Sequence, residues 1–416
     1  KFNNIINGTN DTELGEGLES IAINYDGSRI VVGAPRISTS LPYAKVYEWN
    51  GTNWEITDNM IFKGKSNYDM FAYSSSISDD GNTVAFGSIY GWAEIWKWNP
   101  ENSTGSKWSH FQTITGSDSS YRLGYHIQLN NDATILAIGE PDYNSTSPSH
   151  TKTGRIITYI NNPYIFDKAN GDWSTHWDST NKPVFYTQAN ISINSNQLTL
   201  EYNKSAAGYQ QMGNPYIARN LQHNTVNSSS TWCLPYQARL NGDGTRMIVI
   251  VQHIRGGWTG DVHLLQWDSS SLTWSVHSSR EENYFIGVQA YQNHTAISAD
   301  GSRFAVGFGS TSNSTGYVKI YSWDAPTTVL ATIQLNTVGG QTRDYAGVNA
   351  DLNADGTVVA FAETDSDQKG TNSGHVEVWE QTDGSTWSQR GGFNTDPLIS
   401  DAGDLMGEQA NDNAGK

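Results

Sequence analysis

A short strand-turn-strand pattern recurs along the chain, and it restricts the possible folds more than any other feature of the sequence. Its clearest copy runs from Ile21 to Trp54, where β-branched and aromatic runs alternate with the turn Tyr25-Asp26-Gly27-Ser28 and the turn Asn50-Gly51. Asp-Gly and Asn-Gly tolerate the positive φ of tight hairpins. Each copy therefore predicts antiparallel strands joined by short turns.

Further copies of the turn and second strand follow at similar spacing. They begin at Asp80, Asp132, Asn194, Asp243, Asp300 and Asp355, and the copy at Asn194 is degenerate. Successive copies lie roughly 50 to 60 residues apart, which is the period of a propeller blade. Seven copies predict an all-β fold, a seven-bladed β-propeller of four-stranded antiparallel blades.

The repeat predicts one closed domain over residues 1–396, with an irregular part at residues 161–236. The N-terminal segment resembles the outer strands and is a candidate to complete the last blade, which would leave no open sheet edge. Residues 397–416 either pack against the ring or start a further repeat, because Leu405-Met406-Gly407-Glu408 echoes Leu14-Gly15-Glu16.

Composition restricts the partners. The formal net charge is −17 and charged residues make up 16% of the chain, so the surface repels phosphate backbones and excludes nucleic acid as an expected partner. No apolar run is long enough to cross a bilayer, so no direct membrane span is expected. The single cysteine, Cys233, excludes an internal disulfide and is either buried and inert or a cross-link to another chain.

Acceptor sequences for N-linked glycans occur mostly in predicted turns, where an acceptor has to lie. They are Asn7, Asn10, Asn50, Asn102, Asn144, Asn190, Asn203, Asn227, Asn293 and Asn313. If the source is eukaryotic, this pattern predicts a glycoprotein located outside the cell or at the cell surface.

One turn and the strand after it carry a family resemblance. Asn24-Tyr25-Asp26-Gly27 followed by Gly33-Ala34-Pro35 resembles the FG-GAP repeats of integrin α propellers, and the hairpins resemble FG-GAP-like repeats of large cell-surface proteins in microbes and algae. In integrins this turn is a calcium loop with flanking acids. Here those acids are missing apart from Asp351, so the turns are predicted to be plain hairpins.

A weak calcium candidate remains elsewhere. Glu363, Asp365 and Asp367 lie close together in the sequence and carry the hard oxygen ligands that calcium prefers. The alternative is a solvated acidic loop. No other cofactor is expected.

Aromatic residues near predicted loops are the candidate ligand-binding residues. Tyr90, Trp92, Arg255 and Trp258 lie beside loops between second and third strands, which line one face of a propeller. Aromatic residues in the irregular part, among them Trp173 and Trp177, either line a binding face or fill gaps in a poorly formed blade.

The chain lacks recognisable catalytic motifs, and it is predicted not to be an enzyme. The expected function is an extracellular adhesion or binding module for a glycan or another surface protein. The alternative is a structural subunit or section of a glycosylated surface filament or fibre that self-assembles. A sialidase-like glycan-processing enzyme comes third, because Asp383-Gly384-Ser385-Thr386-Trp387 has the wrong spacing for an Asp-box.

Overall fold

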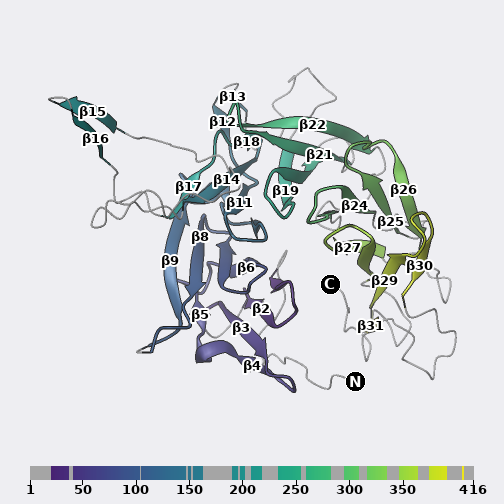
Figure 1. Cartoon of the computed structure of the whole chain (residues 1–416), viewed down its shortest axis with the longest axis horizontal. Helices are drawn as coiled ribbons and strands as arrows, with labels where there is room; N and C mark the ends of the chain where they lie inside the picture. Colours follow the sequence, from purple (N-terminus) through teal and green to yellow (C-terminus); the bar gives the residue numbers. More distant parts are fainter. Residues whose placement is uncertain are drawn as a thin grey trace.

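The computed structural model describes a ring of antiparallel β-sheets. The described residues are 20–36, 41–103, 105–146, 149–150, 153–162, 190–194, 197–201, 208–217, 233–253, 259–282, 295–308, 316–334, 346–363, 374–390 and 405–406. They form six sheets, each with a path of four antiparallel strands, and these blades follow one another around the ring in sequence order (Figure 1). The predicted all-β propeller of four-stranded blades is confirmed, whereas the predicted number of seven blades is wrong.

The first three blades occupy the N-terminal half. Blade 1 contains β1 (Ile21–Ile23), β2 (Arg29–Ala34), β3 (Tyr43–Trp49), β4 (Trp54–Ile56), the 3-10 helix η1 (Thr57–Asn59) and β5 (Phe62–Lys63). Blade 2 contains β6 (Phe71–Ile77), β7 (Thr83–Ser88), β8 (Trp92–Trp98) and β9 (Trp108–Thr115), and η2 (Ser119–Tyr121) follows it. Blade 3 contains β10 (Ile127–Leu129), β11 (Ile135–Glu140), β14 (Arg155–Asn162), β17 (Gly208–Gln211) and β18 (Tyr216–Ile217).

The last three blades complete the ring. Blade 4 contains β19 (Cys233–Leu240), β20 (Arg246–His253), β21 (Thr259–Asp268) and β22 (Thr273–Glu282). Blade 5 contains β23 (Thr295–Ile297), β24 (Arg303–Phe308), β25 (Tyr317–Ser322) and β26 (Val329–Gln334). Blade 6 contains β27 (Ala346–Leu352), β28 (Val358–Glu363), β29 (His375–Gln381), β30 (Trp387–Gln389) and β31 (Leu405–Met406), and β31 pairs with β29.

The degenerate repeat copy explains why seven blades were predicted. It forms β15 (Asn190–Asn194) and β16 (Gln197–Glu201), which among the described strands pair only with each other and which lie between β14 and β17 of blade 3 in the sequence. A second small hairpin is formed by β12 (Ser145–Thr146) and β13 (Ser149–His150), and it lies between β11 and β14 of blade 3 in the sequence. A blade needs four strands in one sheet, and here β17 returns to pair with β14, so the copy is an insertion and not a blade.

The Asp-Gly turns join neighbouring blades through backbone hydrogen bonds. At five junctions a turn N–H donates to the carbonyl oxygen of the residue before the turn acid in the next blade. The bonds run from Tyr25 to Asp79 (3.3 Å), Asp79 to Asn131 (2.8 Å), Asn131 to Gly242 (3.3 Å), Gly242 to Ala299 (2.8 Å) and Asp300 to Ala354 (3.0 Å). The repeated turns therefore connect the blades as well as reversing the chain.

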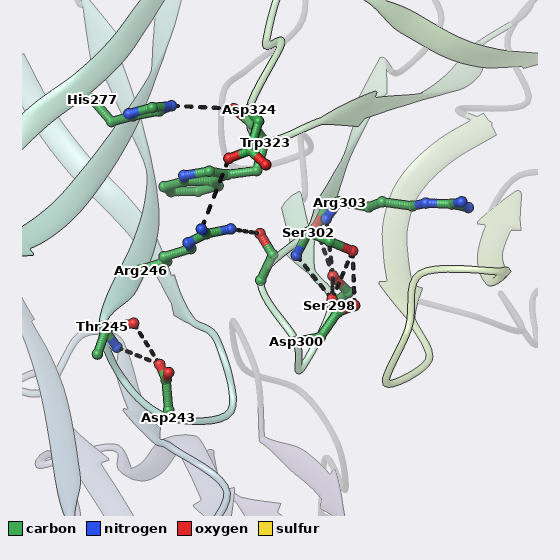
Figure 2. Close-up of polar contacts among 11 residues, drawn as sticks. Asp243, Thr245, Arg246, His277, Ser298, Asp300, Ser302, Arg303, Trp323 and Asp324 are labelled. Carbon is green, nitrogen blue, oxygen red and sulfur yellow. Dashed lines mark hydrogen bonds and ion pairs between the residues drawn. The ribbon is translucent and has the colours of Figure 1, made fainter. Parts of the chain in front are cut away.

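Arginine side chains reinforce three of these junctions, and Figure 2 shows the one formed by Arg246. Arg246 Nη1 of blade 4 donates to the carbonyl oxygen of Gly301 in blade 5 at 2.7 Å. Arg29 and Arg303 make the same contact with Gly81 and Gly356, at 3.0 and 3.1 Å. Each receiving glycine has a positive φ and lies so close to the arginine side chain that a Cβ would clash with it. Because glycine has no side chain, it permits both the positive φ of the turn and the close contact with the arginine of the neighbouring blade.

The hydrophobic core lies between blades. Val31 and Val46 of blade 1 pack with Phe86 and Trp108 of blade 2, and equivalent clusters fill the other junctions. Alternate residues of each strand face opposite neighbours, so blades 2 to 5 each contribute to two clusters, and blades 1 and 6 to one each among the described residues.

Tryptophan pairs close three of the hairpins between third and fourth strands. The ring centroids of Trp49 and Trp54 are 5.4 Å apart, those of Trp98 and Trp108 5.3 Å, and those of Trp267 and Trp274 5.5 Å. In blade 6 the register differs, because Trp387 faces Gln381 and Trp379 faces Gln389.

Candidate functional site

Loops from blades 1 to 3 converge on the face of the ring opposite the Asp-Gly turns, called the loop face below. The connections between second and third strands reach this face, and so do the connections from one blade to the next. Two backbone bonds tie them together: Gly116 N–H donates to Gly91 O at 2.8 Å, and Asp142 N–H donates to Tyr121 O at 3.3 Å. The loops that carry the candidate residues of blades 2 and 3 therefore form one continuous surface.

Two sequence-predicted residues lie at the loop face in blade 2. Tyr90 is 50% exposed, whereas Trp92 is only 8% exposed. The Trp92 ring stacks on Phe71, with centroids 5.4 Å apart, and the Lys65 ammonium lies 3.8 Å from the indole centroid. Lys65 also lies 3.4 Å from Glu94. Trp92 thus supports the loop from within, and Tyr90 presents the accessible ring.

The structure adds a group of residues that the sequence analysis missed. This Tyr-Arg cluster consists of Tyr121, Arg122, Asp142, Tyr143 and Arg155. Tyr121 and Tyr143 meet edge to face with centroids 5.4 Å apart, and the Arg155 guanidinium carbon lies 3.9 Å from the Tyr143 centroid. Arg122 Nε forms an ion pair with Asp142 at 2.5 Å. Both tyrosines are partly exposed, so the cluster offers rings and guanidinium groups to solvent.

A buried carboxylate lies beneath the Tyr-Arg cluster. The Glu140 side chain is fully buried, its Oε2 accepts from Arg155 Nε, and its Oε1 has no hydrogen-bond partner. Burial raises the pKa of the Glu140 carboxyl, and the hydrogen bond and charge of Arg155 oppose that rise. Glu140 holds Arg155 by one oxygen and so orients its guanidinium beside Tyr143.

The raised pKa of Glu140 predicts a definite pH dependence of stability. The folded state binds the proton more tightly than the unfolded chain, so this group stabilises the fold at low pH and loses that contribution as the pH rises through its folded pKa. The stability of the wild type minus that of Glu140→Gln should therefore fall as the pH rises from below the ordinary glutamate pKa of about 4.3 through the higher pKa of the folded state. Urea denaturation at a series of pH values measures it.

Asp118 offers a control of opposite sign. Hydrogen bonds from the side chain and backbone of Ser120 lower the pKa of the Asp118 carboxyl. The contribution of Asp118 to stability is present above the pKa of the unfolded chain and is lost as the pH falls. The stability of the wild type minus that of Asp118→Asn should therefore rise with pH. Equal slopes for the two variants would contradict the assignment of Glu140.

The donor arrangement of the cluster favours an uncharged polar ligand. Arg155 Nε donates to Glu140, Arg122 Nε lies 2.5 Å from Asp142 Oδ2, and neither arginine has a hydrogen-bond partner for its Nη groups among the described residues. Because Asp142 and Glu140 balance Arg122 and Arg155, the cluster carries several N–H donors with little net charge. Exposed tyrosine rings beside such donors suit the apolar faces and hydroxyl groups of a sugar.

Other predicted site residues lie outside the described residues. These are Arg255, Trp258, Trp173, Trp177, Asp365 and Asp367, and of Glu363 the structure describes the backbone at the end of β28. Within the described ranges, no three histidine, cysteine, aspartate or glutamate residues lie close enough together to hold a metal ion. A calcium site at residues 363–367 stays a prediction.

The predicted glycan acceptors are described in part. Asn50 is exposed at the β3–β4 turn, where its Oδ1 accepts from the backbone N–H groups of Thr52 and Asn53. Asn102 and Asn144 lie in described loops, and Asn190 begins β15. Asn7, Asn10, Asn203, Asn227, Asn293 and Asn313 lie outside the described residues. In the part of the chain that can be described, no helix is long and apolar enough to span a membrane.

No protein-family model matches the chain, and no curated protein matches it. The chain is similar to Kuenenia stuttgartiensis hydrazine synthase, with a TM-score of 0.50 and 11% identity over 90% of this chain and 80% of the other. It is also similar to Chaetomium thermophilum Sqt1 bound to the N-terminus of the ribosomal protein L10, with a TM-score of 0.48 and 11% identity over 91% of this chain and 76% of the other.

A putative 6-phosphogluconolactonase from Bacteroides fragilis gives a TM-score of 0.48 and 11% identity, over 89% of this chain and 82% of the other. The likeness to hydrazine synthase, at 11% identity, concerns the fold alone, and the strand topology itself defines the class of the chain as a β-propeller. The finer resemblance to FG-GAP-like repeats stays a prediction.

Proposed function

We propose that this chain is a non-enzymatic, extracellular β-propeller that binds a glycan through its loop face. The observation that carries the proposal is the surface formed by Tyr90 and the Tyr-Arg cluster, where partly exposed rings lie beside guanidinium groups whose charge is already balanced. The predicted glycan acceptors support the extracellular setting, and N-linked glycans and a cell-surface location belong to the same proposal.

A neutral oligosaccharide is the preferred ligand class. The formal net charge of −17 disfavours acidic partners at long range, and the balanced cluster offers no strong local attraction that would overcome it. Sugar rings stack on tyrosine through their apolar faces, and their hydroxyl groups accept hydrogen bonds from the Nη groups of Arg122 and Arg155.

Glycan binding can be tested with an array of neutral and acidic oligosaccharides, followed by titration calorimetry with the best neutral one. Tyr90→Ala and Tyr143→Ala should each weaken binding about tenfold, which corresponds to about 1.4 kcal/mol of lost contact. Because the ligand is uncharged, the affinity should change little with salt concentration.

Tyr25→Ala is the matched control, because Tyr25 is a 75% exposed tyrosine in an Asp-Gly turn on the opposite face. Its binding should equal that of the wild type. Equal loss in all three variants, or binding restricted to acidic glycans and abolished by salt, would contradict the proposal. An array without any binding, together with specific capture of a protein ligand lost in Tyr90→Ala, would favour a protein partner at the same face.

A further inference from the structure

We propose that the loop face binds an unbranched, neutral oligosaccharide along an arc of four tyrosines, and that Tyr68 is a further binding residue at the blade 1 end of this arc. The inference rests on the proposed glycan binding and adds to it the shape of the ligand. The arc has one tyrosine on each of four successive loops, and its members are Tyr68, Tyr90, Tyr121 and Tyr143.

Each tyrosine of the arc offers part of its ring to solvent. Tyr68 and Tyr90 are 78% and 50% exposed, and Tyr121 and Tyr143 are partly exposed. They lie, in this order, on the connection from blade 1 to blade 2, the β7–β8 loop, the connection from blade 2 to blade 3 and the β11–β14 loop. Because blades 1, 2 and 3 are neighbours in the ring, these loops follow one another along the loop face (Figure 1).

A serine joins the Tyr68 loop to the Tyr90 loop. Ser88 Oγ donates to the carbonyl oxygen of Asp69, the residue after Tyr68, at 2.5 Å. The same oxygen accepts from the backbone N–H of Tyr90 at 3.2 Å. The two backbone bonds of the loop face continue this connection to the loops of blade 3. The surface that carries Tyr90 and the Tyr-Arg cluster therefore extends to Tyr68.

Gly91 brings the Tyr90 loop against the connection to blade 3. Its φ is +91°, and a Cβ at this position would lie 2.7 Å from Ser119 Cα. Glycine is the residue that permits both the positive φ and the close approach. Ser119 lies two residues before Tyr121, so the loops that carry Tyr90 and Tyr121 are in direct contact.

A buried carboxylate fixes the loop that carries Tyr68. Asp69 is 3% exposed, and its carboxylate accepts from the backbone N–H groups of Lys65, Ser66 and Phe71, at 2.5, 3.0 and 3.1 Å. The backbone around Tyr68 is thus ordered before a ligand arrives. A ring on an ordered loop loses less conformational entropy on binding, which favours affinity.

The charges along the arc favour a neutral ligand. The Lys65 ammonium lies 3.4 Å from the Glu94 carboxylate and 3.8 Å from the Trp92 ring centroid, so its charge is balanced. Asp118 is exposed on the connection that carries Tyr121. Its carboxylate accepts hydrogen bonds from hydroxyl groups and repels acidic sugars.

A row of rings on separate loops suits a linear chain of sugars. A single sugar unit covers only part of the arc, and each further unit of an unbranched chain can place its apolar face on another ring. The Nη groups of Arg122 and Arg155 supply donors at the blade 3 end. Affinity should therefore increase with chain length, and Tyr68 should contribute only to the binding of chains long enough to reach it.

Titration calorimetry with neutral oligosaccharides of increasing chain length tests this, starting from the best neutral sugar of the array. The longest chain should bind the wild type about tenfold or more tightly than the disaccharide. Tyr68→Ala should weaken binding of the longest chain about tenfold and leave binding of the disaccharide unchanged. Tyr143→Ala should weaken both, because the short chain binds at the Tyr-Arg cluster.

Tyrosine nitration, read by mass spectrometry, gives a second measure on the wild type itself. The longest chain should protect Tyr68 from nitration, and the disaccharide should not. Tyr25 is the matched internal control, because it is 75% exposed, close to the 78% of Tyr68, and lies on the opposite face. Its nitration should be the same with and without the sugar.

The outcomes separate this inference from glycan binding itself. Equal affinity for short and long chains, a Tyr68→Ala variant that binds the longest chain like the wild type, or a Tyr68 that stays reactive would each overturn the arc. Glycan binding at the Tyr-Arg cluster would then still stand. Binding of no chain of any length would overturn both proposals.

Discussion

Replacing Trp323 with alanine should lower the free energy of unfolding by about 3 to 5 kcal/mol, the range for removing a large aromatic side chain from a core. Trp323 follows β25 of blade 5 and is 0% exposed. His277 of blade 4 stacks on it with centroids 5.4 Å apart and planes at 9°, and the Arg246 guanidinium carbon lies 5.3 Å from its ring centroid (Figure 2). The indole therefore fills the junction between two blades.

The loss of stability in Trp323→Ala should include the lost contact between the indole ring and Arg246. Arg246 donates to Gly301 O, and the indole beside it keeps the guanidinium in place. Without the ring, the guanidinium loses one wall of its site and water reaches the junction. Urea denaturation of Trp323→Ala, Arg246→Ala and the double variant measures the coupling, which should be favourable and about 0.5 kcal/mol or more.

Trp54→Ala is the matched control for Trp323→Ala. Trp54 also lies at a turn between third and fourth strands, but it is partly exposed and pairs with Trp49 within blade 1. The loss of stability in Trp54→Ala should be clearly smaller, because the Trp54 ring pairs within its own blade. Equal losses for the two variants would show that the tryptophans stabilise their own hairpins and not the junction.

The sequence predicts most of the blades because the repeat is local. Asp26-Gly27 and its copies fix a turn, and alternating apolar residues such as Val31 and Ile135 fix the strands on either side. The number of blades depends on pairing between distant strands. The copy at Asn194 has the local pattern of a blade, yet β17 pairs with β14 across it, and no local pattern encodes that choice.

The candidate site is less predictable for the same reason. Tyr90 was found because its loop position is set by the repeat. The Tyr-Arg cluster combines the connection before blade 3 with the loop after β11, which come together only in the folded ring. One signal was present in the sequence. Glu140 ends β11, an otherwise apolar strand, and Arg155 begins β14, the next strand of the same blade, directly opposite Glu140 in the sheet. A buried charge at a strand end often has such a partner.

Replacing Ile127 with alanine should cost about 2 to 5 kcal/mol, whereas the same change at Ile21 should cost less than about 0.5 kcal/mol in the monomer. Both residues begin the inner strand of a blade and have the same place in the register. Ile127 is 0% exposed between blades 2 and 3, and Ile21 is 55% exposed. The pair compares one repeat position with and without a preceding blade.

This comparison also tests whether the side of blade 1 that carries Ile21 is covered. Urea denaturation should show the large difference in cost between Ile127→Ala and Ile21→Ala, because only Ile127 is buried against another blade. A cost of Ile21→Ala as large as that of Ile127→Ala would mean that another part of the molecule covers Ile21.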